Sequence, residues 1–470
     1  MKFQDERKRP FSRRRRFLGQ VAMGGAGLLA GKEIRASQGS QTREDVKMED
    51  LGSWDVMVFG GGPAGIVAAT QAARAGAKVL LMEKNSILGG TTTSAGVNFP
   101  GLFHAWGKQV ISGIGWELVK RCVETIGGTF PDFSVVPDRH WKHQVRVDRA
   151  VYAALADEMV IESGAELLFH AMPASVEETN QGVEVAVCTK TGLAHAEATV
   201  AVDCTGDANA LFLAGCRLIR PESLQPGTLM LRLSGYELKG VDKEEFLKSC
   251  QEAINAGELK AEDCPGGPPS AWRVLAAHGD NALDVTGVDG GSSQGRTAAE
   301  LAGRGALLRL YRFYRRQAGL EKLSVDYMAS ECGIRETVTI DGLEKVTVDD
   351  YVSGKVWPDA VCHSFYPIDW HRASGHGIEQ RKLQEGVVAT IPRGALLPKE
   401  RSRLVAAGRC ISSDQLANSA LRVQATCMAV GQASGALAAL AAQSGRTVQD
   451  VEMTALRSLL RKHNAIVPEG

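Results

Sequence analysis

The chain has 470 residues, of which 44% are hydrophobic, and its 54 basic side chains balance its 54 acidic ones. A single hydrophobic core grows inefficiently beyond roughly 250 to 300 residues, so this length favours two or three domains. The basic side chains are not clustered as on a nucleic-acid-binding face, so no nucleic-acid partner is expected. The 52 glycines suit a protein whose backbone comes close to a cofactor.

Residues 1–50 are predicted to be an export signal followed by a disordered spacer. Eight basic and two acidic side chains lie in residues 1–16, and Arg13 to Arg16 are followed by Phe17 and Leu18. This order resembles a twin-arginine signal, and the apolar run after it is too short and too Gly-rich to span a membrane. We expect a periplasmic or otherwise exported protein whose precursor meets the export machinery, and not an integral membrane protein.

The next residues predict a strand, a helix and a second strand. The strand WDVMVFGGG starts at Trp54, the helix ends at Gly76, and AKVLLMEK follows. Between strand and helix, Gly60, Gly62 and Gly65 form a GxGxxG motif. The first glycine permits the turn, the second lets backbone N–H groups reach a pyrophosphate, and the third packs the helix on the strand. The motif therefore predicts a dinucleotide-binding turn.

A carboxylate stands where such a site needs one. Glu83 ends the second strand, eighteen residues after Gly65. There it can accept hydrogen bonds from ribose hydroxyls and would repel a 2′-phosphate. By contrast, the Gly-rich stretch at 287–295 has no apolar strand before it and is predicted to be a loop that enters a helix. One dinucleotide domain is therefore expected.

The rest of the chain is predicted to divide the nucleotide domain into two parts. Residues 51–215 form its first part, with a helix capped by Asp148, a strand at 164–172, and a strand pair at 184–190 and 197–208. Residues 216–390 form a substrate or cap domain. A strand at 402–410 and a long small-residue helix at 421–445 return the chain to the nucleotide domain within 391–445, and residues 446–470 are a tail.

The ten cysteines are at least twelve residues apart, which excludes a CxxC pair and the close runs that hold iron–sulfur clusters. We interpret them as buried small hydrophobic residues, with one or two disulfides left open for an exported chain. No metal site is predicted.

Several segments together carry a family resemblance. They are GGGPAGIVAATQAARAGAKVLLMEK, LGGTTTSAGVNFPG, VDCTGDANALFLAG, GIRETVTIDG, YPIDWH and AAGRCISSDQLANSALRVQATCMAVGQASG. The chain resembles the bacterial FAD-dependent oxidoreductases of the glutathione-reductase-like superfamily, distantly related to fumarate reductase flavoproteins and heterodisulfide reductase A subunits. The resemblance implies an α/β fold: a Rossmann-like FAD-binding domain with a central parallel sheet, plus a mixed α+β substrate domain.

The resemblance also implies which residues hold a non-covalent FAD. Around the pyrophosphate and ribose these are Gly60, Gly62, Pro63, Ala64, Gly65, Glu83, Lys84, Gly89, Gly90 and Thr91. Further along the chain they are Ala171, Met172, Thr205, Gly206, Asp207, Gly408, Arg422 and Val423. Many relatives have Asp after the last glycine, where this chain has Arg409. The start of the final helix is expected to face the flavin pyrimidine edge, where its partial positive charge would stabilise the reduced flavin.

Four residues are candidates for substrate chemistry. Asp369 and His371 in YPIDWH are two apart, so in a strand they share a face, and the Asp could orient the His as a proton-transfer residue. Arg335 in GIRET is a candidate substrate or flavin anchor, or else forms a structural salt bridge with Glu336. His104 follows the second Gly-rich turn and could border the flavin.

The favoured interpretation is an FAD-dependent dehydrogenase or reductase. Hydride would pass between an unknown small organic substrate and flavin N5, and electrons would pass to a non-nicotinamide partner such as a quinone or cytochrome. One alternative is a fumarate-reductase-like reductase of an unsaturated acid. Another is a flavin-binding electron carrier that is not an enzyme.

Overall fold

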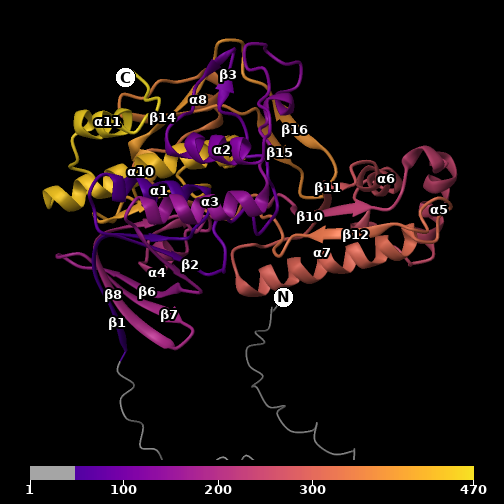
Figure 1. Cartoon of the computed structure of the whole chain (residues 1–470), viewed down its shortest axis with the longest axis horizontal. Helices are drawn as coiled ribbons and strands as arrows, with labels where there is room; N and C mark the ends of the chain where they lie inside the picture. The colour runs from indigo at the N-terminus through magenta and orange to yellow at the C-terminus, as the bar shows by residue number, and fades with distance from the viewer. Residues whose placement is uncertain (1–47, 470) are drawn as a thin grey trace, which may run out of the picture. The chain divides into compact units, whose positions relative to one another are not determined.

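The computed structural model describes residues 48–469, and its main sheet has seven strands, seen at the lower left of Figure 1. The strand order is β5-β2-β1-β8-β7-β6, and β18 also pairs with β8. Five strands run parallel, and β7 and β6 continue the sheet antiparallel. The strands are β1 (Glu49–Phe59), β2 (Val79–Glu83), β5 (Glu166–Phe169), β6 (Met172–Glu178), β7 (Val183–Thr189), β8 (Gly192–Asp203) and β18 (Leu404–Ala406). The predicted α/β class is confirmed.

Helix α10 (Gln424–Ser444) packs directly on helix α1 (Pro63–Arg74), and glycines make the contact. A Cβ on Gly431 would lie 2.3 Å from the backbone oxygen of Ala64, and a Cβ on Gly435 would lie 2.2 Å from that of Ala68. Because neither oxygen belongs to a flexible side chain, only glycine lets the two helices approach this closely. The close contact fixes the start of α1 against the sheet.

We expect Gly435→Ala to lower the free energy of unfolding by about 1–3 kcal/mol, since its methyl group would overlap the α1 backbone. Gly305→Ala is the matched control, because Gly305 is also helical but its nearest neighbour is the flexible side chain of Arg309. Its better helix propensity should raise stability by up to about 1 kcal/mol. Urea denaturation measures both changes, and an unchanged or more stable Gly435→Ala would contradict this packing.

A second core lies in the lobe on the right of Figure 1, built from a three-stranded sheet and three helices. Its elements are β10 (Gly227–Ser234), α5 (Lys243–Asn255), α6 (Pro268–Ala276), β11 (Gly279–Val285), α7 (Ser293–Tyr314) and β12 (Ser324–Met328). The predicted loop at 287–295 does enter α7, and the Ser292 side chain before that helix accepts a hydrogen bond from the Gly295 N–H. The expectation that no strand precedes this loop is wrong, because the largely buried β11 ends at Val285. Residues 346–391 contribute instead to the core of the main sheet. The domain boundaries at 215 and 390 stay predictions.

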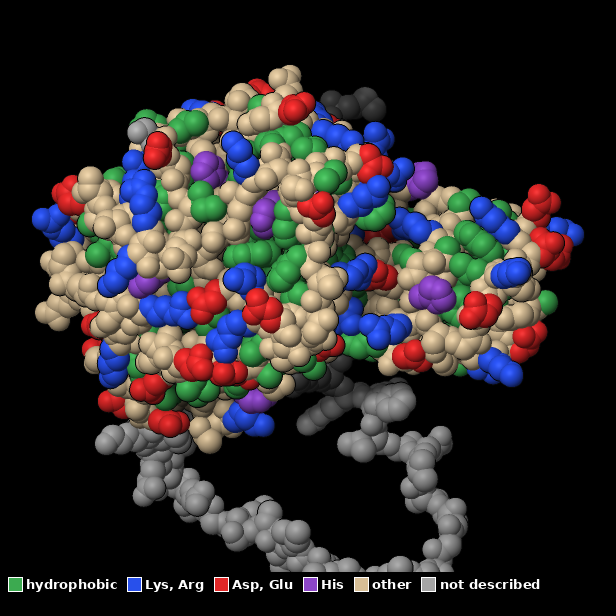
Figure 2. All heavy atoms as spheres, turned by 45° about the horizontal axis from the view of Figure 1, so that its top comes forward, with side chains coloured by type: hydrophobic (Ala, Val, Ile, Leu, Met, Phe, Trp, Pro, Cys, Tyr) green, Lys and Arg blue, Asp and Glu red, His purple; other side chains and the backbone are tan. Residues whose placement is uncertain are grey.

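Short ribbons and further helices complete the described chain. The paired ribbons are β3 (His104–Ala105) with β4 (Lys108–Gln109), β9 (Leu218–Ile219) with β13 (Thr339–Ile340), β14 (Ala360–Ser364) with β17 (Ala389–Pro392), and β15 (Ile368–His371) with β16 (Ile378–Arg381). The helices are α1 (Pro63–Arg74), α2 (Ile114–Thr125), α3 (Arg149–Glu162), α4 (Asn209–Leu213), α8 (Val348–Ser353), α9 (Gln415–Leu421), α10 (Gln424–Ser444) and α11 (Met453–Lys462). Basic and acidic side chains are interspersed on the face shown in Figure 2.

Several predicted strands have different limits in the structure. The strand predicted at 197–208 is β8 (Gly192–Asp203), and the strand predicted at 402–410 is reduced to β18 (Leu404–Ala406). Strand β1 begins at Glu49 rather than Trp54, because its exposed start still pairs with β8 across a bulge near Gly52. The single strand predicted at 164–172 is wrong: β5 ends at Phe169 and β6 begins at Met172. His170 between them has a φ of +56°, which turns the chain from one neighbour strand to another.

The single helix predicted at 421–445 is also interrupted. Helix α9 ends at Leu421, Val423 is extended, and α10 begins at Gln424. Helix α10 is long and apolar enough to cross a membrane, but most of it is buried within the protein and it serves as a core helix. Nine of the ten cysteines are buried, as predicted, and Cys188 is exposed.

Candidate functional site

The GxGxxG turn lies at the carboxyl edge of β1 and is shaped by backbone contacts. Gly60 has a φ of +96°, and a Cβ there would lie 2.7 Å from the Cys204 oxygen. A Cβ on Gly65 would lie 1.8 Å from the Gly60 oxygen. These two glycines therefore hold the turn against β8 and the start of α1, as the motif predicts.

Gly62 differs from these glycines because its missing side chain leaves open space. A Cβ there would have no neighbour within 4 Å, and Gly62 lines a cavity of about 1170 Å³. Helix α1 begins at Pro63 without a side-chain cap, so N–H groups of its first turn remain available. A glycine without a side chain and free donors at a helix N-terminus fit a pyrophosphate.

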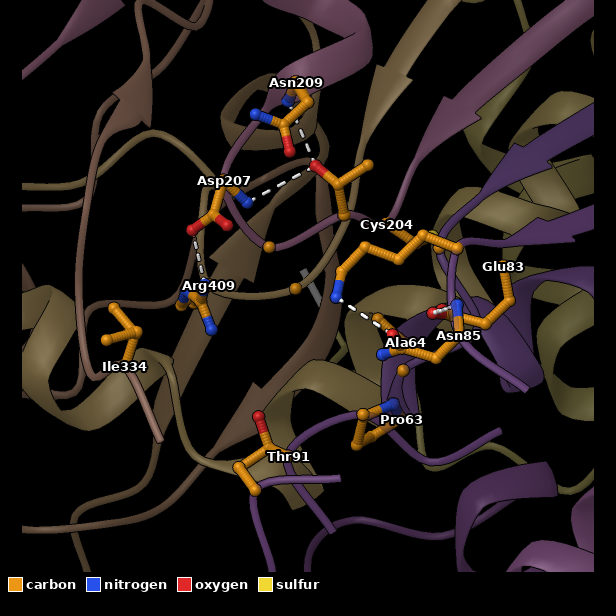
Figure 3. Close-up of a pocket in the computed structure, with 18 of the residues that line it drawn as sticks. Pro63, Ala64, Glu83, Asn85, Thr91, Cys204, Asp207, Asn209, Ile334 and Arg409 are labelled. Carbon is orange, nitrogen blue, oxygen red and sulfur yellow. Dashed lines mark hydrogen bonds and ion pairs between the residues drawn. The ribbon is translucent and has the colours of Figure 1, made fainter. Parts of the chain in front are cut away.

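Glu83 and Asn85 form one wall of this dinucleotide cavity (Figure 3). The Glu83 carboxylate accepts hydrogen bonds from the N–H of Gly61 at 2.7 Å and of Asn85 at 2.8 Å. These bonds hold the carboxylate in place, and each oxygen keeps a further lone pair for a ribose hydroxyl. Met172, half exposed, lies at the cavity surface.

The opposite wall carries a buried charge cluster (Figure 3). Asp207 pairs with Arg409 and, at 2.7 Å, with Arg296, and accepts a hydrogen bond from Thr337 at 2.9 Å. Burial alone would raise the pKa of Asp207, but the two guanidinium groups lower it. Arg409, which stands where many relatives have Asp, thus neutralises the carboxylate of the neighbouring turn.

Most predicted cofactor residues line this one cavity. They are Gly60, Gly62, Pro63, Ala64, Glu83, Lys84, Gly90, Thr91, Ala171, Met172, Thr205, Gly206, Asp207, Gly408 and Arg422. Gly65 and Gly89 shape the turns beside the cavity. A Cβ on Gly89 would lie 2.5 Å from the Thr93 side chain, and the contact of Gly65 with the Gly60 oxygen is described above. Val423 lines the adjoining cavity instead.

Sequence reasoning missed several polar residues that line the dinucleotide cavity, among them Asn85, Asn209, Arg296 and Glu331. Asn85 could have been found from its place two residues after Glu83. Arg296 and Glu331 flank the second lobe and belong to no motif, so no local signal marks them.

A substrate cavity of about 780 Å³ adjoins the dinucleotide cavity and brings together three of the four catalytic candidates, Arg335, Asp369 and His371. Thr91, Ile334, Arg409, Arg422 and Gln424 line both cavities. A cofactor held in the first cavity would therefore be next to a substrate in the second.

His371 and Asp369 lie on one face of β15, as the two-residue spacing predicts. Nε2 of His371 is 3.3 Å from Oδ2 of Asp369, and both side chains are largely buried. The N–H groups of the two residues donate to Gln225 and Ser419, each at 3.0 Å. The backbone of the pair is thereby anchored to segments on both sides.

The protonation states of this pair follow from burial and the nearby arginines. Burial lowers the pKa of His371 and the Arg335 charge adds to this, while the hydrogen bond to Asp369 acts against both. Burial would raise the pKa of Asp369, but His371, Arg422 and Arg335 together lower it. The arrangement is a neutral imidazole beside an ionised carboxylate, which suits a general base.

Arg335 does not pair with Glu336. Its guanidinium donates to the Pro226 oxygen and lies 3.5 Å from Asp284. Glu336 accepts hydrogen bonds from the backbone and side chain of Gln225. Burial lowers the pKa of Arg335 to about 10.

His104 is the one catalytic candidate that lies elsewhere. It lines a third cavity and stacks on Phe133 with ring centroids 3.7 Å apart. Burial and the His143 charge lower its pKa to about 4.

The comparisons with known proteins agree with this geometry. A family model described as FAD dependent oxidoreductase matches residues 55–460. Digeranylgeranylglycerophospholipid reductase 2 of Methanopyrus kandleri is 30% identical over 198 residues, 41% of this chain and 46% of that protein. Thiamine thiazole synthase of Methanococcus vannielii is 35% identical over 75 residues, 15% of this chain and 29% of that protein. The chain thus spans less than half the length of these curated relatives.

Solved structures match over more of the chain at lower identity. A geranylgeranyl bacteriochlorophyll reductase-like protein from Thermoplasma acidophilum is 12% identical, with 88% of this chain and 83% of that chain covered and a TM-score of 0.40. The structure of BexE is 14% identical, with 86% and 65% covered and a TM-score of 0.42. Because the family model covers most of the residues, including both cavities, the protein belongs to the FAD dependent oxidoreductase family, is an enzyme, and has FAD as its cofactor.

Proposed function

We propose that the protein is a dehydrogenase that oxidises a small organic substrate at a carbon bonded to OH or NH. The observation that carries this proposal is the buried His371–Asp369 pair in a cavity continuous with the dinucleotide cavity. FAD, when bound, supplies the acceptor for the hydride at its N5. Electrons then pass to a non-nicotinamide acceptor such as a quinone or cytochrome.

The residues of the substrate cavity have separate tasks. Neutral His371 takes the proton from the substrate OH or NH, and Asp369 orients the imidazole and stabilises its protonated form. Arg422 donates to Gln225 and to the Asp369 backbone oxygen, while its buried Nε has no partner in the structure.

Anaerobic stopped-flow mixing with a panel of alcohols, hydroxy acids, sugars and amines tests the proposal. We expect at least one compound to bleach the flavin absorbance near 450 nm. A flavin that stays oxidised with every small molecule, and is reduced only by a protein partner, would show an electron carrier instead.

One observation favours the reverse reaction, reduction of an unsaturated acid. Arg335 lies in the substrate cavity, and its lowered pKa of about 10 makes it a better proton donor than an ordinary arginine. Similarity to a reductase over 46% of that relative points the same way.

Changing Arg335 tests whether the enzyme reduces an unsaturated acid. If the enzyme reduces an unsaturated acid, Arg335→Lys and Arg335→Ala should both keep bound FAD, since Arg335 does not line the dinucleotide cavity. Reoxidation of the dithionite-reduced flavin by that acid should fall roughly 10²-fold or more. Unchanged reoxidation in both variants would exclude Arg335 as the proton donor.

We also propose that the enzyme works outside the cytoplasm. The support is the arginine-rich sequence ending in Phe17 and Leu18, which lies outside the described residues. Fractionation of cells that express the full chain tests this proposal, and retention of all the protein in the cytoplasm would contradict it.

A further inference from the structure

The third cavity, which we call the outer cavity, has a volume of about 610 Å³ and takes no part in the reaction proposed above. It lies between the β3 segment, residues 136–143, and the chain just before β15 and just after β16. Its walls include Leu102, His104, Trp106, His140, Phe365 and Leu383.

Consecutive residues of one chain segment line the outer cavity and the substrate cavity. Phe365 and Pro367 line the outer cavity, whereas Tyr366 between them lines the substrate cavity with Asp369. This segment, between β14 and β15, therefore forms part of the partition between the two cavities.

A pair of side chains bridges the partition. The Tyr366 hydroxyl lies 3.2 Å from Nε2 of His140, which lines the outer cavity. Gln144, which lines the substrate cavity, donates to the same hydroxyl at 3.4 Å. Polar contact thus runs from one cavity to the other through the Tyr366 hydroxyl.

The outer cavity has aromatic walls and two uncharged imidazoles, and the exposed Asp138 and Lys382 also line it. Trp106 and Phe365 meet edge to face with centroids 5.4 Å apart. Burial lowers the pKa of His140 and of His104, so both rings are neutral near pH 7. Flat apolar walls beside neutral imidazoles suit a planar, uncharged ring that carries oxygens.

We propose that the outer cavity binds the electron acceptor, a quinone. This rests on the proposed function, in which electrons leave FAD for a partner other than a nicotinamide. The quinone takes two electrons from reduced FAD, and its two C=O groups become C–OH. One proton comes from reduced FAD and the other from solvent, with Tyr366 and His140 between the cavities. FAD returns to its oxidised form.

The test uses the holoenzyme reduced with one equivalent of dithionite and mixed anaerobically with 2-methyl-1,4-naphthoquinone. Leu383→Trp fills the outer cavity, and Trp106→Leu removes an aromatic wall without adding bulk. Trp141→Ala is the control, because Trp141 is 52% exposed and does not line the cavity. We expect wild type and the control to reoxidise alike, and both cavity variants roughly tenfold or more slowly, with FAD content unchanged.

Direct binding is measured separately by isothermal titration calorimetry of 2-methyl-1,4-naphthoquinone into the oxidised holoenzyme. We expect Leu383→Trp to weaken the binding and the control to retain it. Wild-type reoxidation and binding in both cavity variants would overturn the proposal, as would competition between quinone and the reducing substrate for one site. Dithionite reduces FAD in this test, so the test does not depend on finding a reducing substrate in the panel. A negative result here would in turn not contradict the dehydrogenase proposal.

Discussion

Replacing Gly62 with valine is expected to give a folded but colourless protein. Gly62 has φ −73° and ψ −176°, an extended conformation that valine adopts readily, and a Cβ there meets nothing within 4 Å. The apoprotein should therefore tolerate the side chain. Its methyl groups would occupy the space into which the first turn of α1 presents its N–H groups. We expect FAD affinity to fall roughly 100-fold or more, about 2.8 kcal/mol.

The measurement is the ratio of absorbance at 450 nm to that at 280 nm, with circular dichroism to verify folding. Gly240→Val is the matched control, since Gly240 also has open space around it but lies far from the cavity lining. A Gly62→Val protein that purifies with the wild-type FAD content would show that the pyrophosphate binds elsewhere.

His371→Gln is expected to slow flavin reduction by the substrate roughly 10²- to 10⁴-fold, because glutamine can hydrogen-bond to Asp369 but cannot accept the proton at neutral pH. FAD content should stay at the wild-type level, since His371 does not line the dinucleotide cavity. Stopped-flow absorbance with the compound that bleaches the wild type measures the rate constant. His376→Gln, at an exposed histidine in the turn after β15, is the control.

The pH dependence gives this prediction a second readout. Burial and Arg335 lower the pKa of His371, so the reactive neutral form persists below the ordinary histidine pKa of about 6.5. The wild-type rate constant should be level above that pH and fall only under more acidic conditions. In Asp369→Asn the acidic limb should move to still lower pH, because the carboxylate that raises the pKa is lost. If the pH profiles of Asp369→Asn and His371→Gln both match the wild-type profile, His371 is not the general base.

Sequence patterns predicted the structure correctly where the backbone geometry of neighbouring residues alone determines it. Glycines with a positive φ or a close backbone contact, such as Gly60 and Gly65, follow directly from the motif. Asp148 caps α3 by accepting from two N–H groups, as its place before the helix predicts. The two-residue spacing put Asp369 and His371 on one face.

Sequence patterns did not predict the features that depend on a contact with a residue distant in the sequence. The break between α9 and α10 has no glycine or proline at Arg422 or Val423, yet it places both residues at the cavities. The pairing of Asp207 with Arg296 joins residues that are 89 positions apart. The place of His104 in the outer cavity depends on its stacking with Phe133, which no short pattern shows.

The amino-acid sequence by itself therefore determined the dinucleotide turn, the α/β class and the His371–Asp369 pair, because steric limits on the backbone and the strand period act between neighbouring residues. Only the tertiary structure decided which arginines line the dinucleotide cavity, and that His371 and His104 line two different cavities. Those features depend on burial and ion pairing between segments that only folding brings together.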